Sequence, residues 1–154
     1  MILGTPITLI ALYSTIMAAL LLMGIIHLLF SYWPHLPERI PIHFGFNGKP
    51  DHWGTKKSSF ILPVISFSLF GLLVWVGYFA PPNFPQDPER PFLQLIMGIM
   101  NVEMMLMFLW IEWRMIRTAL NKAEGMGVWF LPAFLAVLFG TIFLLMKATP
   151  HFTG

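Results

Sequence analysis

The chain has 154 residues, of which 57% are hydrophobic and only 10% are charged, whereas a soluble domain carries roughly 25% charged residues. The nine lysines and arginines exceed the seven acidic residues too slightly for a nucleic-acid-binding surface, and a sequence without cysteine excludes disulfides and thiolate chemistry. We therefore expect an all-α integral membrane protein, with residues 1–154 forming a single membrane domain.

Four segments are apolar over the roughly 20 residues that a membrane-spanning helix needs. Pro6 suits the first position of the first helix, and no Lys or Arg precedes it, so we expect this helix to be retained rather than cleaved as a signal peptide. Gly125 and Gly127 are expected to end an extension of the third helix. The predicted helices cover about residues 6–33, 58–79, 91–113 (extending to about 124) and 128–147. Together they predict a four-transmembrane-helix bundle.

Lysine and arginine residues are unevenly distributed between the two ends of this predicted bundle. Seven of them lie at the end that carries the long loop of residues 34–57, whereas only Arg90 and Lys147 lie at the other end. Positively charged loops are retained in the cytoplasm, so we expect the loop to lie inside the cell and both termini outside.

The loop over residues 34–57 is the longest polar segment, and long loops in compact proteins usually have a function. Pro37 and Pro41 favour an extended chain. Asn47 and Gly48 together indicate a turn, because both residue types tolerate positive φ. The pattern predicts a small hairpin that lies on the membrane surface.

The loop contains the pattern Pro-x-x-Ile-Pro-x-His, followed by a glycine, an aspartate and a lysine. In this pattern the chain resembles the domain of unknown function that opens the SdpI-type bacterial membrane proteins. The resemblance extends over about residues 10–75 and is carried by Pro37, Ile40, Pro41, His43, Gly48, Asp51 and Lys56. It implies a multi-pass protein of the bacterial cytoplasmic (inner) membrane. It also implies a non-catalytic function, either in immunity to a secreted toxin or in membrane signalling to a repressor.

The polar groups of the loop are interpreted first as a scaffold, without catalytic, metal-binding or cofactor-binding residues. In this scaffold His43 bonds the loop backbone and Gly48 adopts a left-handed turn conformation. Asp51 caps a turn or pairs with Lys56, which otherwise lies at the level of the lipid phosphates. The same exposed groups are available to recognise a partner protein or a lipid headgroup.

Two alternatives for the loop involve chemistry. Imidazole and carboxylate groups bind transition metals, so a metal site is one alternative. Its ligands would be drawn from His35, His43, His52 and Asp51. The other alternative is a hydrolytic site in which Ser58 or Ser59 acts as nucleophile and His52 as base.

Four polar residues fall within the predicted membrane-spanning helices, where ionisable groups are costly and often functional. They are His27, Asn101, Glu103 and Glu112. Glu103 lies about 200° around the helix from Asn101, so the third helix has two polar faces, and the face of Glu103 suggests contact with a partner chain. His27 and Glu112 lie at similar depths, and their contact is one hypothesis. The alternative is that His27 bonds a neighbouring carbonyl, while Glu112 either extends toward the membrane surface or pairs with Arg114.

Besides membrane lipids, we expect contact with another membrane protein or with a second copy of this chain, and no nucleic-acid partner. Ala11, Thr15 and Ala19 form a small-residue stripe on the first helix, which allows another helix to approach closely. The third helix is rich in methionine, an adaptable packing residue. These faces also allow an alternative function, an accessory transmembrane subunit of a larger respiratory or photosynthetic complex, which Glu103 favours.

Overall fold

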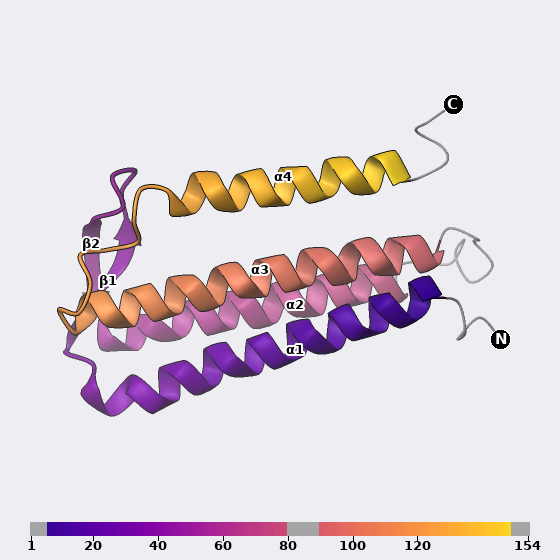
Figure 1. The fold of residues 1–154 in the computed structure, drawn as a ribbon. Coiled ribbons are helices and arrows are strands. Elements are labelled where there is room, and N and C mark those ends of the chain that lie inside the picture. The colour runs from indigo at the N-terminus through magenta and orange to yellow at the C-terminus, as the bar shows by residue number, and fades with distance from the viewer. Residues whose placement is uncertain (1–5, 80–89, 149–154) are drawn as a thin grey trace.

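A computed structural model describes residues 6–79 and 90–148. Three long helices lie side by side, a fourth runs alongside α3, and a small antiparallel sheet lies at one end of the helices (Figure 1). In chain order the helices and strands are α1 (Pro6–Tyr32), β1 (Arg39–Phe44), β2 (Pro50–Thr55), α2 (Ile61–Phe79), α3 (Arg90–Ala119) and α4 (Phe130–Ala148).

Three helical segments of the described chain are long and apolar enough to cross a membrane. These segments are Pro6–His35, Lys56–Phe79 and Arg90–Ala119. The first two include short 3₁₀ turns, η1 (Trp33–His35) after α1 and η2 (Lys56–Phe60) before α2. The apolar part of α4, Phe130–Leu145, is shorter and extends roughly 24 Å, against about 30 Å for the hydrocarbon core. Where the sequence predicts four spans, the structure therefore contains three candidate spans and a shorter apolar helix.

The helices pack around α3, which contacts α1 most extensively and α2 next. Small residues bring α1 and α3 close together. A Cβ added to Gly98 would lie 3.1 Å from the carbonyl oxygen of Ala11 and 3.1 Å from Cβ of Ser14. Ala11, the first residue of the predicted small-residue stripe, is fully buried, so this part of α1 packs inside the chain.

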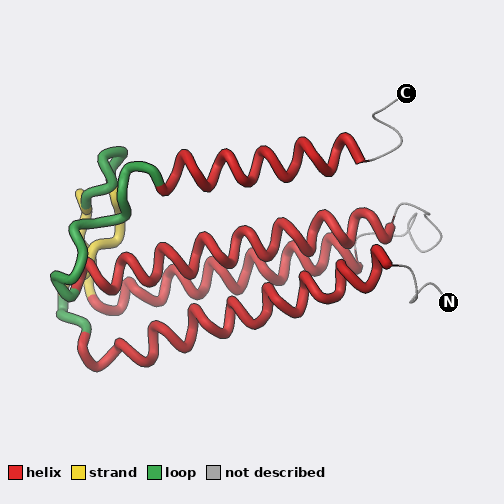
Figure 2. Tube along the Cα trace, viewed as in Figure 1, coloured by secondary structure: helices red, strands yellow, loops and turns green. Residues whose placement is uncertain are grey.

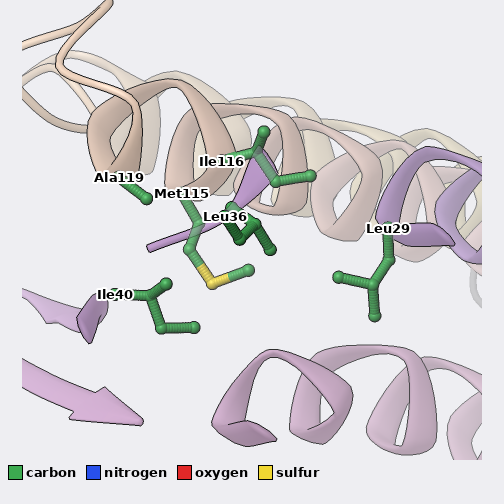
Figure 3. Packing of buried hydrophobic residues seen from close by; sticks show 6 residues of the cluster. All are labelled: Leu29, Leu36, Ile40, Met115, Ile116 and Ala119. Atoms are coloured by element: carbon green, nitrogen blue, oxygen red, sulfur yellow. The ribbon is translucent and has the colours of Figure 1, made fainter. Parts of the chain in front are cut away.

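A hydrophobic cluster joins the sheet to the end of α3 (Figure 3). Its buried members come from the end of α1, the loop, β1 and the last turns of α3, and they are Leu29, Leu36, Ile40, Met115, Ile116 and Ala119. Fully burying one such large aliphatic side chain stabilises a fold by about 1.5–3 kcal/mol. The sheet is therefore held at a fixed place by its own apolar contacts with the helices.

The third helix continues past Trp113, as the sequence predicts, but α3 ends at Ala119 instead of at about residue 124. Asn121 follows the helix in a left-handed conformation, with φ 55°. The amide of Asn121 donates to the carbonyl oxygen of Thr118 at 3.0 Å, and the amide of Lys122 donates to the carbonyl oxygen of Arg117 at 2.7 Å. This Schellman arrangement satisfies the last carbonyls of the helix, and asparagine is the common alternative to glycine at its left-handed position.

Candidate functional site

The loop between α1 and α2 forms the predicted antiparallel hairpin of β1 and β2. At its tip the amide of Gly45 donates to Lys49 O at 2.9 Å, and the amide of Gly48 donates to Gly45 O at 2.8 Å. Gly48 has φ 71°, whereas φ of Asn47 is not positive. The Asn47 side chain instead accepts a hydrogen bond from the Lys49 amide at 3.0 Å. The turn is therefore a three-residue loop that ends in a left-handed glycine, and not the two-residue turn with two positive φ values.

The hairpin tip contacts the connection between α3 and α4 through backbone atoms. The amide of Met126 donates to Gly48 O at 2.7 Å. Nε of Arg114 donates to Gly125 O at 2.6 Å, so a side chain of α3 also holds this connection. Figure 2 shows the two loops side by side. Gly125 and Gly127, predicted to end the third helix, lie instead in this connection with φ 143° and 89°.

His43 in β1 and Asp51 in β2 form a polar pair on the hairpin. Nδ1 of His43 lies 2.6 Å from Oδ1 of Asp51, and the two side chains are 68% and 51% exposed. The hydrogen bond from His43 is the main cause that lowers the pKa of the Asp51 carboxyl below its ordinary value of 3.8. The ionised carboxylate accepts the Nδ1 proton, which leaves Nε2 of a neutral imidazole as an acceptor.

An apolar groove of about 720 Å³ lies between the hairpin and the first turns of α4. Its large apolar lining residues include Ile42, Phe44 and Phe46 from the hairpin and Val128, Leu131 and Leu135 from the connection and α4. Among the described lining residues, His43 and Asp51 are the titratable ones. Apolar walls with a few polar groups, in a volume of roughly 300–1,000 Å³, are typical of ligand pockets.

The residues of the predicted motif contribute to different parts of this structure. Ile40 and Pro41 are fully buried, whereas Pro37 is exposed. Lys56 lies at the base of the hairpin, where its Nζ is 5.1 Å from the centroid of the Trp33 ring, so it does not pair with the aspartate. The other motif residues are the turn glycine and the polar pair described above. The motif thus contains both the anchor of the hairpin and the polar groups of the groove.

The described residues do not assemble the metal site or the hydrolytic site that the sequence allows. Of the four candidate ligands, the structure pairs His43 with Asp51, and no three His, Asp or Glu side chains among the described residues gather closely enough to hold a metal ion. The hydroxyls of Ser58 and Ser59 form contacts of 3.3 and 2.7 Å inside the turn before α2. These contacts do not involve His52, the predicted base.

The predicted contact between His27 and Glu112 is not formed. His27 is exposed on α1, with Nε2 3.3 Å from the hydroxyl of Ser31. Glu112 is fully buried in α3, and neither of its carboxyl oxygens has a hydrogen-bond partner among the described residues. Arg114, the alternative partner for this carboxyl, bonds to the connection between α3 and α4 instead.

The two polar faces predicted for the third helix both find contacts within the chain. Asn101 is 1% exposed, and its Nδ2 donates to Phe70 O at 3.3 Å. On the other face, Oε1 of Glu103 accepts a hydrogen bond from the hydroxyl of Thr141 at 2.6 Å. The fourth helix therefore supplies a partner for Glu103, and this carboxyl does not by itself require a second chain. Sequence reasoning missed Thr141 because no local pattern relates α4 to that face of α3.

One comparison with known proteins identifies part of this region. Residues 19–67 match the family model described as a domain of unknown function (DUF1648), which is found in SdpI-like proteins. The matched segment includes the second half of α1, the whole hairpin and the beginning of α2. No curated protein and no solved structure matches the chain. The part of the chain that resembles the SdpI-like domain is thus the part that forms one wall of the groove.

Proposed function

We propose that the chain is a non-catalytic membrane protein that acts by contact, and that it binds an amphipathic molecule in the groove between the hairpin and α4. The observation that supports this function is an apolar groove in which one exposed pair, His43 and Asp51, supplies the polar groups. Apolar walls select a hydrophobic ligand, and a few polar groups orient it. The resemblance to SdpI-type proteins favours an immunity-like or signalling-like role for this contact.

Filling the groove tests this function. Leu131 lines the groove and is 48% exposed, so the larger ring of Leu131→Trp occupies the groove without entering the helix core. We expect the wild-type chain to protect cells that a secreted peptide toxin kills, and Leu131→Trp to abolish the protection. Val137 is 57% exposed on α4 and does not line the groove, so Val137→Trp is the matched control and should still protect. Unchanged killing in the presence of the wild-type chain overturns the immunity-like role.

The hairpin is proposed to face the cytoplasm of a bacterial inner membrane. The excess of lysine and arginine at the hairpin end supports this orientation. Phe46 is fully exposed at the tip, and the chain contains no cysteine, so Phe46→Cys creates a single labelling site. A membrane-impermeant maleimide should label this site only after the membrane has been opened. Labelling in intact cells contradicts the orientation.

A second candidate function is that of an accessory subunit in a larger respiratory or photosynthetic complex. It is favoured by α4, which is apolar apart from Thr141 and Lys147 although none of its described side chains is buried. Such a surface suits lipid or a neighbouring membrane protein. Gentle solubilisation followed by native electrophoresis distinguishes the accessory-subunit function from a protein that acts on its own. Migration as a single chain excludes the subunit function, whereas co-migration with a large assembly supports it.

A further inference from the structure

We infer that the groove holds a lipid with a primary ammonium headgroup, an aminophospholipid, whose ammonium meets His43 and Asp51 while one acyl chain lies along α4. The inference rests on the proposed function, because it names the chemical class of the molecule that the groove binds. Three features support it: an apolar row on α4, the acceptors at the hairpin, and the position of the groove at the end of the candidate spans.

The apolar row continues from the groove along α4. Leu131 and Leu135 line the groove, and Phe139 and Phe143 follow at the same four-residue spacing, which places successive side chains next to one another on a helix. The four side chains are exposed by 48%, 38%, 64% and 60%. The row extends roughly 18 Å, slightly more than the roughly 15 Å of one hydrocarbon leaflet. It therefore offers the length of surface that one acyl chain covers.

The polar end of the groove offers hydrogen-bond acceptors. A carboxylate has several acceptor sites, and His43 uses only one oxygen of Asp51. Whenever the His43 ring carries no second proton, its Nε2 is a further acceptor. None of the described residues that line the groove is Lys or Arg, so the ionised Asp51 gives the site a preference for a cation. A primary ammonium carries a positive charge and three N–H donors, and it complements both side chains.

The position of the groove favours a lipid over an apolar peptide with a free amine. The hairpin lies at one end of the candidate spans, and α4 runs from the groove alongside them (Figure 1). A membrane lipid meets this surface with its headgroup at the end of the bundle and its acyl chain parallel to the helices. A peptide has to enter the bilayer before it reaches the same row, whereas lipid is already present there.

Lipids that differ only in headgroup methylation test the inference. Because the chain has no cysteine, Phe139→Cys places a single fluorophore on the apolar row, and Val137→Cys places one on a neighbouring exposed part of α4 outside the row. The full-length protein is reconstituted in phosphatidylcholine vesicles that contain a quencher lipid with a spin-labelled acyl chain. The quencher is phosphatidylethanolamine, its N-methyl form, its N,N-dimethyl form or phosphatidylcholine, all with the same chains.

We expect phosphatidylethanolamine to half-quench the Phe139→Cys fluorophore at a roughly three- to tenfold lower mole fraction than phosphatidylcholine. The methylated forms should fall in between, because each methyl group replaces an N–H donor. Quenching at Val137→Cys should not depend on the headgroup. Equal quenching of the Phe139→Cys fluorophore by all four lipids overturns the inference.

Variants of the hairpin locate the headgroup. His43→Ala and Asp51→Asn should remove the preference for phosphatidylethanolamine, whereas His52→Ala, at an exposed histidine that does not line the groove, should retain it. If a hairpin variant fails to fold, the comparison of the four lipids with the unaltered hairpin still tests whether the groove prefers phosphatidylethanolamine. Displacement of the phosphatidylethanolamine quencher by an equimolar apolar peptide with a free α-amino group assigns the groove to peptide and overturns the lipid inference.

The outcomes separate this inference from the proposed function. Equal quenching together with intact protection by the wild-type chain overturns the lipid inference and leaves the contact function standing. A preference for phosphatidylethanolamine without any protection from toxin supports the lipid site and overturns the immunity-like role.

Discussion

The carbonyl oxygen of Gly48, at the hairpin tip, accepts a hydrogen bond from the amide of Met126 at 2.7 Å, and this bond joins the hairpin to the connection between α3 and α4. The two backbones are in close contact. A Cβ on Gly48 would lie 2.7 Å from the carbonyl carbon of Gly127, and a Cβ on Gly125 would overlap the carbonyl oxygen of Gly48. The contact therefore requires residues without side chains on both loops, and it fixes the hairpin relative to the start of α4.

Gly48→Ala should destabilise the protein, because the substitution adds a Cβ at φ 71° and forces it against Gly127. A left-handed conformation in a residue other than glycine and a displaced loop together cost about 1–3 kcal/mol. Thermal unfolding in detergent measures the change. Gly140→Ala is the matched control, since a Cβ there meets nothing within 4 Å, and it should be neutral or stabilising by up to about 1 kcal/mol. Equal effects of the two substitutions contradict the importance of this contact.

Acid should weaken the hairpin through Asp51. The hydrogen bond from His43 lowers the folded-state pKa of this carboxyl, so the unfolded segment binds the proton more readily than the folded one. The resulting stabilisation is present above the ordinary value of 3.8 and is lost as pH falls through the lower folded value. The amide signal of Gly48 in an NMR titration should report this loss. Asp51→Asn should lack the acid step, Glu38→Gln should retain it, and an unchanged step in Asp51→Asn contradicts the assignment.

The helices and the hairpin were predictable because each has a local signal in the sequence. Apolar runs of sufficient length predict α1, α2 and α3, and the Asn47-Gly48 pair predicts the turn. The sequence did not predict that Asn121 terminates α3. Basic and apolar residues continue beyond Asn121, and the left-handed conformation that ends the helix is less common in asparagine than in glycine.

The candidate site was only half predictable, because its two walls come from distant parts of the chain. The wall that contains His43 and Asp51 lies in the loop with the recognisable motif, and the sequence predicts a possible binding role for both residues. The Leu131 wall comes from α4, and no pattern in either segment shows that they meet. A glycine at position 125 is explained by the sequence alone as a helix terminator, so the sequence gives no reason to expect its contact with the hairpin.

Glu112→Met should stabilise the protein. The Glu112 side chain is fully buried, both carboxyl oxygens lack a partner among the described residues, and a buried polar group without a hydrogen bond costs about 1–3 kcal/mol. Methionine has a similar volume and no polar oxygen, so a gain of about that size is expected in thermal unfolding. Glu112→Gln keeps a buried polar group, so it should increase the stability of the protein only slightly. Destabilisation by Glu112→Met shows instead that the carboxyl has a partner in the working protein, such as a bound cation.

Thr141→Val should loosen α4 from the other helices. The Thr141 hydroxyl donates to Oε1 of Glu103 at 2.6 Å, and Oε2 of Glu103 already lacks a partner among the described residues. The isosteric valine leaves the whole carboxyl without a hydrogen bond, at a cost of about 1–3 kcal/mol.

Because no described side chain of α4 is buried, this cost should appear as movement of α4 rather than as unfolding of the three long helices. Spin labels on cysteines introduced at Leu106 of α3 and Val137 of α4, both exposed, measure the distance between the helices. The distance distribution should broaden in Thr141→Val and remain narrow in Thr141→Ser, which keeps the hydroxyl donor. Identical distributions in both variants mean that other contacts hold α4, and the wall of the groove then does not depend on Glu103.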